Sequence, residues 1–200
     1  MNALKATDLS TETQQKKIIL ASQSPRRKQL LEWAEVPFEV LVQSTDESYP
    51  LDLPAAEVAV YIARNKALAV MQLQQPDVPV LAADTIVVLN GEIIGKPADR
   101  EHAIKILTKL SGRQHKVITG VVILNGNSEI AFADTTEVEF HSLTLAQIEF
   151  YVDKYKPYDK AGAYAIQEWI GVVGIKSVKG DFYNVMGLPV SRVVQALLHC

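Results

Sequence analysis

The chain has 200 residues, a formal net charge of −3 and 48% hydrophobic residues, which suits a single α/β domain. That hydrophobic content can build a core without metal or disulfide staples, and it argues against wholesale disorder. The near-balanced charge argues against a nucleic-acid partner, because duplex-binding proteins usually carry a basic excess. Cys200 is the single cysteine, so an intrachain disulfide and a cysteine-based metal cluster are excluded and a reducing compartment is favoured.

The N-terminal residues show no targeting signal. Residues 1–15 are polar and mixed in charge, so we expect a flexible N-terminal arm followed by one domain over residues 16–200. The longest apolar run, residues 78–89, is interrupted by Asp84 and is too short to span a bilayer as a helix. We therefore expect a cytoplasmic protein without a membrane partner.

The first part of the chain predicts a strand, a tight turn and a helix. Residues 17–22 have a short buried-strand pattern, and Ser24 as N-cap with Pro25 at the first helical position predicts that a helix follows. A second strand is predicted over residues 38–43, and a longer helix over about residues 55–73.

Hairpins dominate the middle of the chain. Residues 78–89 and 92–94 are predicted as strands joined by Asn90-Gly91, the commonest type I′ turn signal. Asp99 is predicted to cap a helix that stops at Gly112. The remaining predicted elements are a hairpin of residues 117–124 and 130–140 around Asn125-Gly126, a helix to about residue 155 with Thr144 and Gln147 as capping box, a sheet-like segment over residues 172–178, and a final helix opened by Pro189.

Hairpins mixed with crossover helices predict an α/β, or mixed α+β, fold around a twisted mixed sheet flanked by helices. A purely parallel doubly wound sheet is not expected, because two hairpins require antiparallel pairs.

The first candidate site is the segment Ser22-Gln23-Ser24-Pro25-Arg26-Arg27. The start of a helix offers unpaired N–H groups and a positive dipole end, and together these bind phosphate. Two arginines in the first turn oppose the dipole unless an anion is present, which suits a polyphosphate ligand. The alternative for this segment alone is an ordinary capped helix with two solvated arginines.

The second candidate is Asp84-Thr85, at the end or bend of an apolar strand. Aspartate is depleted inside strands, and an ionised carboxylate among apolar residues must be paired or coordinate a cation. A catalytic base or a Mg²⁺ ligand would explain this placement. The alternative is an aspartate that bonds the backbone of a turn.

Further candidates are weaker individually. Lys66 and Lys96 are candidate phosphate contacts, and Asp46-Glu47 is a candidate source of a second metal-facing carboxylate, although solvated surface side chains are the usual alternative. Gln167 has a donor and an acceptor with which it could bind the edge of a base, or it is a surface amide. The four histidines show no ligand spacing and are interpreted as structural.

Six segments of the chain occur together in the order found in one known family. They are Ala21-Ser22-Gln23-Ser24-Pro25-Arg26-Arg27, Ala83-Asp84-Thr85, Gly95-Lys96-Pro97, Thr119-Gly120-Val121, Asp159-Lys160-Ala161-Gly162-Ala163-Tyr164-Ala165-Ile166-Gln167 and Asn184-Val185-Met186-Gly187-Leu188-Pro189. From about Lys17 to the C-terminus the sequence resembles the Maf family of nucleotide pyrophosphatases. The resemblance implies hydrolysis of nucleoside triphosphates to monophosphate and pyrophosphate, with a divalent cation. It also implies a fold related to the inosine triphosphate pyrophosphatases, with the active-site cleft between two lobes.

The family resemblance also implies a substrate branch. Arg26, Lys66 and Gln167 match the branch that acts on dTTP and UTP, rather than the sibling branch that acts on 7-methyl-GTP. The sequence departs from the common pattern at Ala165, where glycine is frequent, and at Glu168-Trp169, where a glycine-containing turn is usual.

Together, the resemblance and the residue chemistry predict one scheme. The triphosphate would be bound by the backbone amides at the Ser24 turn together with Ser22, Arg26, Arg27, Lys66 and Lys96. Glu47 and Asp84 would hold Mg²⁺ or Mn²⁺, and Asp84 would accept a proton from the water that attacks the α-phosphorus. Gln167, with Thr85 nearby, would select a pyrimidine.

Two further expectations complete the sequence-based hypothesis. The partner is a small nucleoside triphosphate, and a homodimer is the default assembly. The rival hypothesis from another class is a nucleotide-binding regulator of cell division without significant turnover. The presence of both Asp84 and Glu47 favours the enzyme, because a regulator does not need these acids.

Overall fold

A computed structural model describes residues 17–74 and 76–200, so the predicted N-terminal arm lies outside the described residues. In chain order the elements are β1 (Ile18–Leu20), α1 (Pro25–Trp33), β2 (Phe38–Val40), α2 (Ala55–Gln74), β3 (Val80–Leu89), β4 (Glu92–Ile94), α3 (Arg100–Leu110), β5 (Gln114–Asn125), β6 (Ser128–Phe140), α4 (Leu145–Tyr155), the 3₁₀ turn η1 (Ala161–Ala163), α5 (Trp169–Gly174), β7 (Ile175–Lys179), α6 (Phe182–Met186) and α7 (Val190–Leu197). Within the described ranges, none of these helices has the length and apolar content needed to cross a membrane.

The strands form one mixed sheet in the order β2-β1-β3-β5-β6-β7, with β4 also paired to β3. β1 is parallel to both β2 and β3, whereas all the other pairs are antiparallel. The predicted mixed α/β sheet flanked by helices is therefore confirmed.

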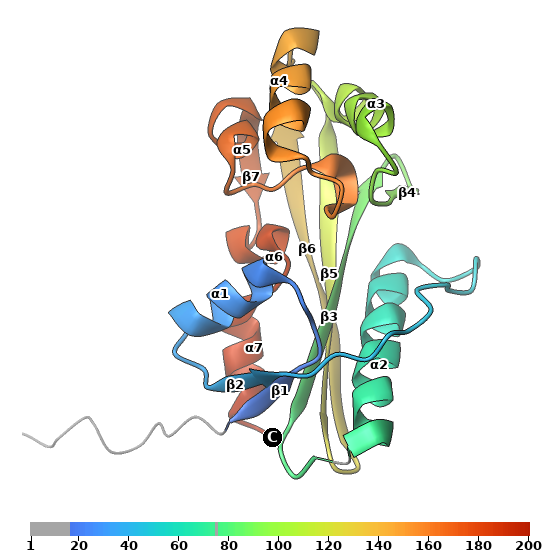
Figure 1. Ribbon diagram of the computed structural model, residues 1–200, viewed down its shortest axis with the longest axis vertical. Coiled ribbons are helices and arrows are strands. Elements are labelled where there is room, and N and C mark those ends of the chain that lie inside the picture. Colours follow the sequence, from blue (N-terminus) through green and yellow to red (C-terminus); the bar gives the residue numbers. More distant parts are fainter. Residues whose placement is uncertain (1–16, 75) are drawn as a thin grey trace, which may run out of the picture.

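The ten-residue strand β3 has a continuous neighbour on one side only. On that side β5 pairs with it from Val80 to Val88. On the other side, β1 pairs with Val80 and Leu81, and β4 pairs with residues 87–89. Residues 82–86 therefore have no strand beside them on this edge. Figure 1 shows β1, β2 and α1 toward one end of the long strands, and β4, α3 and α4 toward the other.

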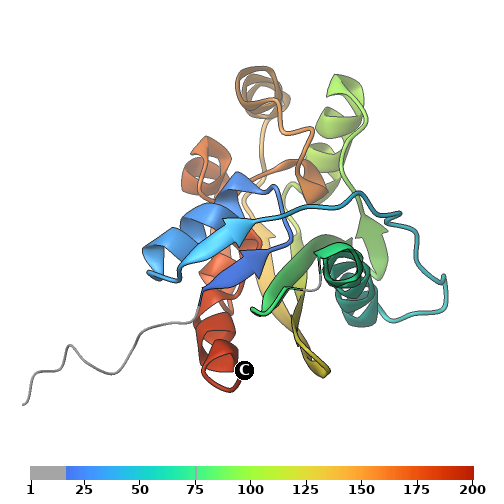
Figure 2. The ribbon, with the colours of Figure 1, turned by 60° about the horizontal axis from the view of Figure 1, so that its bottom comes forward.

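The two faces of the sheet are covered differently. Figure 2 shows α2 and α7 on opposite sides of the strands. Alternate residues of β3, among them Val80, Ala82 and Ile86, pack on the α2 side, while Leu81 and Ala83 belong to the larger core beneath the other helices. Asp84 and Thr85 are consecutive, so their side chains lie on opposite faces of the strand.

Gly120 lets α2 approach the sheet closely. It pairs with Asp84 across β3 and β5, and a Cβ atom at this position would lie 2.3 Å from the backbone of Ala59 in α2. Lys66 follows Ala59 by seven residues, two turns further along the same helix face. The helix can therefore bring a side chain directly over the gap in β3.

The structure corrects several boundaries. Asp84 lies in the middle of β3, not at its end or at a bend. Asn125 pairs with Ser128 as the last residue of β5, so the turn consists of Gly126 and Asn127. Residues 172–174, predicted as part of a strand, belong to α5.

Three short elements were not predicted, namely η1 and the helices α5 and α6. Elements this short bury too few residues to give a periodic pattern. The predicted domain limits, residues 1–15 and 16–200, stay predictions.

Candidate active site

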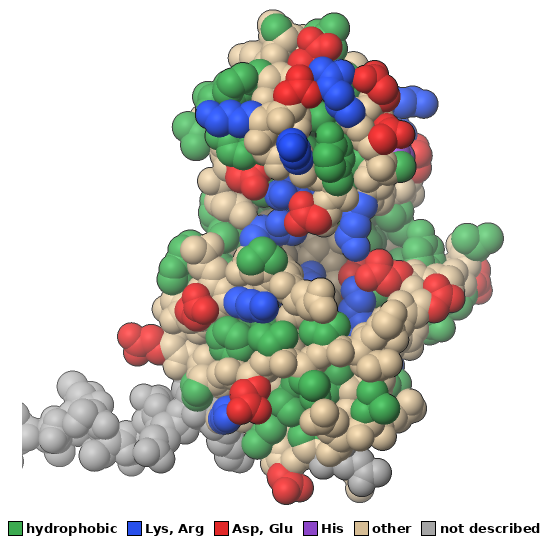
Figure 3. Space-filling view, in the orientation of Figure 1, with side chains coloured by type: hydrophobic (Ala, Val, Ile, Leu, Met, Phe, Trp, Pro, Cys, Tyr) green, Lys and Arg blue, Asp and Glu red, His purple; other side chains and the backbone are tan. Residues whose placement is uncertain are grey.

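A cleft of about 630 Å³ opens where β3 lacks a neighbour on one edge. Its walls come from the β1–α1 turn, the segment after β2, α2, β3, the segment around Lys96, the loop with η1, and the end of α6. Figure 3 shows a hollow near the middle of the molecule with several Lys and Arg side chains around it. The predicted cleft between two parts of the fold is therefore present.

On the α2 side of the cleft, Lys66 lies between two carboxylates. Its Nζ is 2.6 Å from Asp84 Oδ1 and 2.7 Å from Glu47 Oε1. Lys96 Nζ lies 3.5 Å from the second oxygen of Glu47. The Asp84 side chain is only 14% exposed, whereas that of Glu47 is 48% exposed, so this group opens to solvent at the Glu47 end.

The hydrogen bond from Lys66 holds the pKa of Glu47 below its usual range, against a smaller opposing effect of burial. Glu47 therefore stays ionised at neutral pH, and the group of two lysines and two carboxylates is formally neutral.

On the other side of β3, Arg27 is buried and hydrogen-bonded through all three of its nitrogens. Its Nε donates to the carbonyl of Gly187 at 2.7 Å. Its Nη1 donates to Ser22 Oγ and its Nη2 to Thr85 Oγ1, each at 3.1 Å. Burial lowers the pKa of this guanidinium, with Asp84 as the largest opposing influence. Arginine nevertheless remains charged in proteins.

The acceptors around Arg27 are themselves fixed. Ser24 caps α1 by accepting from the Arg27 backbone N–H, and the Ser24 backbone N–H donates to Ser22 Oγ at 3.2 Å. Thr85 Oγ1 lies 2.9 Å from Thr119 Oγ1, and Thr119 donates to the Asn184 carbonyl at 3.0 Å. The turn before α1 is thus bonded to β3, β5 and α6, which orients the first turn of α1 at the cleft.

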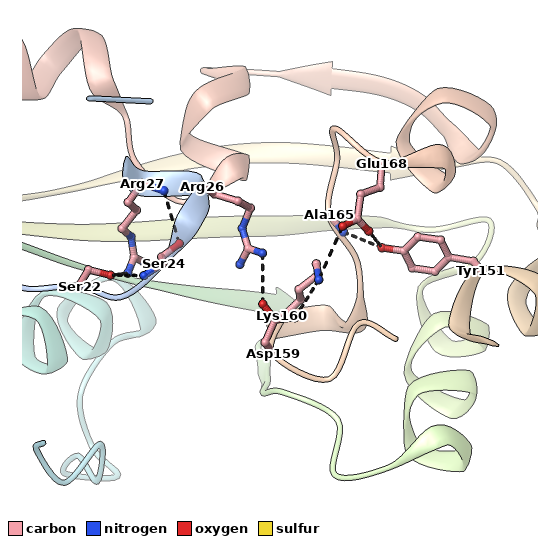
Figure 4. Close-up of polar contacts among 9 residues, drawn as sticks. All are labelled: Ser22, Ser24, Arg26, Arg27, Tyr151, Asp159, Lys160, Ala165 and Glu168. Atoms are coloured by element: carbon pink, nitrogen blue, oxygen red, sulfur yellow. Dashed lines mark hydrogen bonds and ion pairs between the residues drawn. The ribbon is translucent and has the colours of Figure 1, made fainter. Parts of the chain in front are cut away.

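A third group of charges lies along the wall formed by α1 and the loop with η1. Arg26 Nη1 lies 3.4 Å from Asp159 Oδ2, and Lys160 Nζ lies 2.8 Å from Asp159 Oδ1 (Figure 4). Both Asp159 and Lys160 line the cleft. The sequence motif contained them, but they were not predicted as site residues.

The cleft brings together most of the predicted site residues. Those that line it are Ser22, Ser24, Arg26, Arg27, Glu47, Lys66, Asp84, Thr85 and Lys96. Gln167 is exposed and does not line the cleft, whereas Tyr164 and Ala165 of the same segment do. The apolar residues that follow Lys160, almost without interruption through Ile166, could have indicated that this lysine is buried beside the site.

The carboxylates suit a divalent cation that also binds substrate. Among residues 17–74 and 76–200, no group of three or more His, Cys, Asp or Glu side chains forms a self-sufficient metal site. Glu47 and Asp84 nevertheless both direct a carboxylate oxygen at the position that Lys66 Nζ occupies between them. Mg²⁺ is commonly bound by one or two carboxylates together with substrate phosphates, so this pair fits such a cation.

Curated relatives resemble the chain over most of its length. A dTTP/UTP pyrophosphatase of Cytophaga hutchinsonii is 51% identical over 90% of this chain and 82% of its own. The corresponding proteins of Bacteroides thetaiotaomicron and Parabacteroides distasonis are 49% and 47% identical, covering 88% and 92% of this chain and 92% and 95% of theirs. Among solved structures, the Ham1 protein of Staphylococcus aureus is 19% identical, with a TM-score of 0.49 over 92% of this chain and 98% of its own.

The family model described as Maf-like protein matches residues 17–200, which include every residue of the cleft named above. With this match and relatives near 50% identity, the chain belongs to the Maf family.

Proposed function

We propose that this protein hydrolyses dTTP and UTP to the nucleoside monophosphate and pyrophosphate. The names of the curated relatives support this substrate class. The observation that carries the chemistry is Asp84, a largely buried carboxylate in the gap of β3, held by Lys66 inside a cleft rich in cations.

The charge of the cleft suits a small polyanion. Among the described residues, five cationic side chains line it against three carboxylates, a formal excess of two positive charges. The cations are Arg26, Arg27, Lys66, Lys96 and Lys160, and the carboxylates are Glu47, Asp84 and Asp159. The N-terminus of α1 adds N–H groups and the positive end of a helix dipole. A net charge of −3 for the whole chain is therefore compatible with triphosphate binding.

Asp84 is proposed to accept a proton from the water that attacks the α-phosphorus. The new bond joins the water oxygen to the α-phosphorus. The bond from the α-phosphorus to the oxygen that bridges it to the β-phosphorus breaks, and pyrophosphate leaves with that electron pair. Lys66 can exchange one carboxylate for a phosphate oxygen, which frees a carboxylate oxygen of Asp84 and stabilises charge on the phosphoryl group. Arg27 donates three of its five N–H groups to Ser22, Thr85 and Gly187, so it orients the first turn of α1 at the cleft.

Glu47 and Asp84 are the residues proposed to hold Mg²⁺ or Mn²⁺. Such a cation would neutralise phosphate charge and make the bound water more acidic.

The residues that select the nucleobase stay a prediction. Thr85 uses its hydroxyl for Arg27 and Thr119, and Gln167 lies outside the cleft lining. Selection of the nucleobase by Gln167 therefore requires this side chain to reach the cleft when substrate binds, whereas the Thr85 hydroxyl can accept one further hydrogen bond where it is. The cytoplasmic location and the homodimer also stay predictions.

The test is pyrophosphate release from a panel of nucleoside triphosphates, including dTTP, UTP and 7-methyl-GTP, with Mg²⁺ and with Mn²⁺. The wild type should act on dTTP and UTP, and Asp84→Asn should lower kcat by about 10²- to 10⁴-fold because the general base is lost. A matched control is Asp134→Asn, since Asp134 also lies in a strand and pairs with an arginine, Arg192, away from the cleft.

Full turnover by Asp84→Asn would contradict the assigned base. A wild type that binds these nucleotides without releasing pyrophosphate would instead support the regulator hypothesis.

A further inference from the structure

A row of side chains runs from Arg26 of α1, at the cleft wall, to Tyr151 of α4, and the four charged members of the row alternate in sign (Figure 4). Asp159 contacts both Arg26, at 3.4 Å, and Lys160, at 2.8 Å. Behind Lys160, Glu168 Oε1 lies 3.7 Å from the same Nζ, and the Tyr151 hydroxyl donates a hydrogen bond to Glu168 Oε2. The cleft lining contains only the first three residues of the row, Arg26, Asp159 and Lys160.

Lys160 is unusually buried for a lysine, at 8% exposure, yet it borders the cleft. The residues after it are pressed onto the sheet, since a Cβ at Gly162 would lie 2.8 Å from a methyl group of Val87. Within the described part of the chain, the Nζ of Lys160 makes one hydrogen bond, to Asp159. An ammonium has three donors, so this cation can accommodate further acceptors.

The inner end of the row is fixed. Tyr151 is fully buried, and its hydroxyl oxygen accepts a hydrogen bond of 3.1 Å from the backbone N–H of Ala165. Because the same hydroxyl donates to Glu168, the Glu168 carboxylate is held behind Lys160. Glu168 therefore remains as a second carboxylate beside Lys160 when Asp159 moves away.

The outer end of the row is exchangeable. The Asp159 side chain is 60% exposed, and ion pairs this exposed contribute little to stability. A position between a guanidinium and an ammonium is nevertheless well suited to an anion, and phosphate offers more acceptor oxygens than a carboxylate. The Asp159 carboxylate thus lies between Arg26 and Lys160, where an anionic ligand would also be favoured.

We propose that Lys160 is a further substrate-binding residue, and that Asp159 holds the position between Arg26 and Lys160 that a phosphate group of the nucleotide takes. This inference rests on the proposed function, and it specifies how the cleft binds the polyphosphate. When substrate binds, Asp159 turns toward solvent, and Arg26 and Lys160 both contact the phosphate. The competing explanation is that Lys160 and Asp159 only fasten the loop with η1.

The experiment measures binding of inorganic pyrophosphate by calorimetry, together with KM and kcat for the substrate of the wild type. Lys160→Met should weaken pyrophosphate binding and raise KM by about 10- to 100-fold, because a charge-assisted hydrogen bond is lost. Asp159→Asn should strengthen pyrophosphate binding and lower KM by about 2- to 5-fold, because an internal competitor is removed. Lys160→Arg should recover much of the affinity.

Matched controls remove comparable ion pairs outside the cleft. Lys176→Met loses a 2.8 Å contact with Glu139, and Asp153→Asn loses a 2.6 Å contact with Arg100. Neither control should change pyrophosphate binding, since neither residue lines the cleft.

Weaker pyrophosphate binding by Asp159→Asn would overturn the inference, and so would wild-type affinity in Lys160→Met. Asp159 is exposed, so its variant is expected to fold and decides the question even where Lys160→Met does not fold. A wild type that releases no pyrophosphate from any nucleotide would refute the proposed function, whereas the binding data would still test the exchange of Asp159 for phosphate.

Discussion

Asp84 and Thr85 are neighbours in β3, yet the cations on the two faces of the strand are held by different kinds of contact. On the Thr85 side, Arg27 is buried and donates to three fixed acceptors, two hydroxyls and a carbonyl. On the Asp84 side, Lys66 is shared by two carboxylates, and the group opens to solvent through Glu47. On the Thr85 side each nitrogen of the buried guanidinium has an uncharged hydrogen-bond partner, whereas the Asp84 side consists of ion pairs that a ligand can exchange.

The difference shows why two cations in one cleft need not have the same role. Arg27 bonds groups from the β1–α1 turn, β3 and the residue after α6, so its loss would disturb how these segments fit together. Lys66 bonds only ionised groups that water also reaches, and a phosphate can replace either of them. Three predictions, from the largest effect to the smallest, test this division.

Gly120→Ala should have the largest effect on stability, because it prevents the close approach of α2 to the sheet that places Lys66 beside Asp84. The new Cβ would lie 2.3 Å from the α2 backbone, so the helix must shift and carry Lys66 away from Asp84. We expect destabilisation by about 4 kcal/mol or more, or failure to fold, measured by thermal and denaturant unfolding. Gly95→Ala is the control, since nothing lies within 4 Å of a Cβ there. Near-wild-type stability of Gly120→Ala would mean that α2 does not need this close approach.

Arg27→Met and Lys66→Met should separate stability from activity. Arg27→Met leaves buried acceptors without a donor, and we expect it to lower the free energy of unfolding by about 2–4 kcal/mol. Lys66→Met leaves two carboxylates that line the open cleft, one of them half-exposed, so we expect it to lose less stability than Arg27→Met does. Its kcat/KM should fall by about 10²-fold or more, because the phosphate loses a charge-assisted donor. Equal losses of stability in the two variants would remove the distinction between the two sides.

The Glu47 titration should give the smallest signal. The Lys66 hydrogen bond lowers its pKa, so the unfolded chain binds the proton more readily. The resulting stability is complete above the ordinary pKa of 4.5, and is lost as the pH falls through the lower pKa of the folded protein. In Lys66→Met, the pKa of Glu47 measured by NMR should rise toward 4.5. Glu139, whose pKa is held low mainly by Lys176, should titrate unchanged in the same variant.

Much of the fold follows from local signals. Ser24 and Pro25 mark the start of α1, Asp99 caps α3, and Thr144 with Gln147 forms the predicted capping box of α4. Asn90 and Gly91 both have positive φ in the predicted tight turn. In each case, the residues that decide the structure lie within a few positions of one another.

What sequence reasoning missed depends on distant parts of the chain. Asp84 was placed at a strand end because aspartate is rare inside strands. It lies in mid-strand because β1 and β4, separated by more than 70 residues, leave the same edge of β3 uncovered. The Asp159 contact with Arg26 joins residues 133 positions apart, and no local pattern encodes that pairing. The expected place of Gln167 in a base pocket came from a resemblance and not from contacts.

The three long strands of the sheet also determine how the cleft can change width. β3, β5 and β6, of 10, 12 and 13 residues, run unbroken beside the cleft, and their ladders of backbone hydrogen bonds join the elements on both sides of it. The two walls are therefore not separate bodies on a flexible linker. A hinge movement that changed the separation of the two ends of the sheet would have to alter the twist of these long strands. Adjustment of the cleft to substrate is therefore expected in the loops and side chains that line it, such as Asp159, more than in the sheet beneath it.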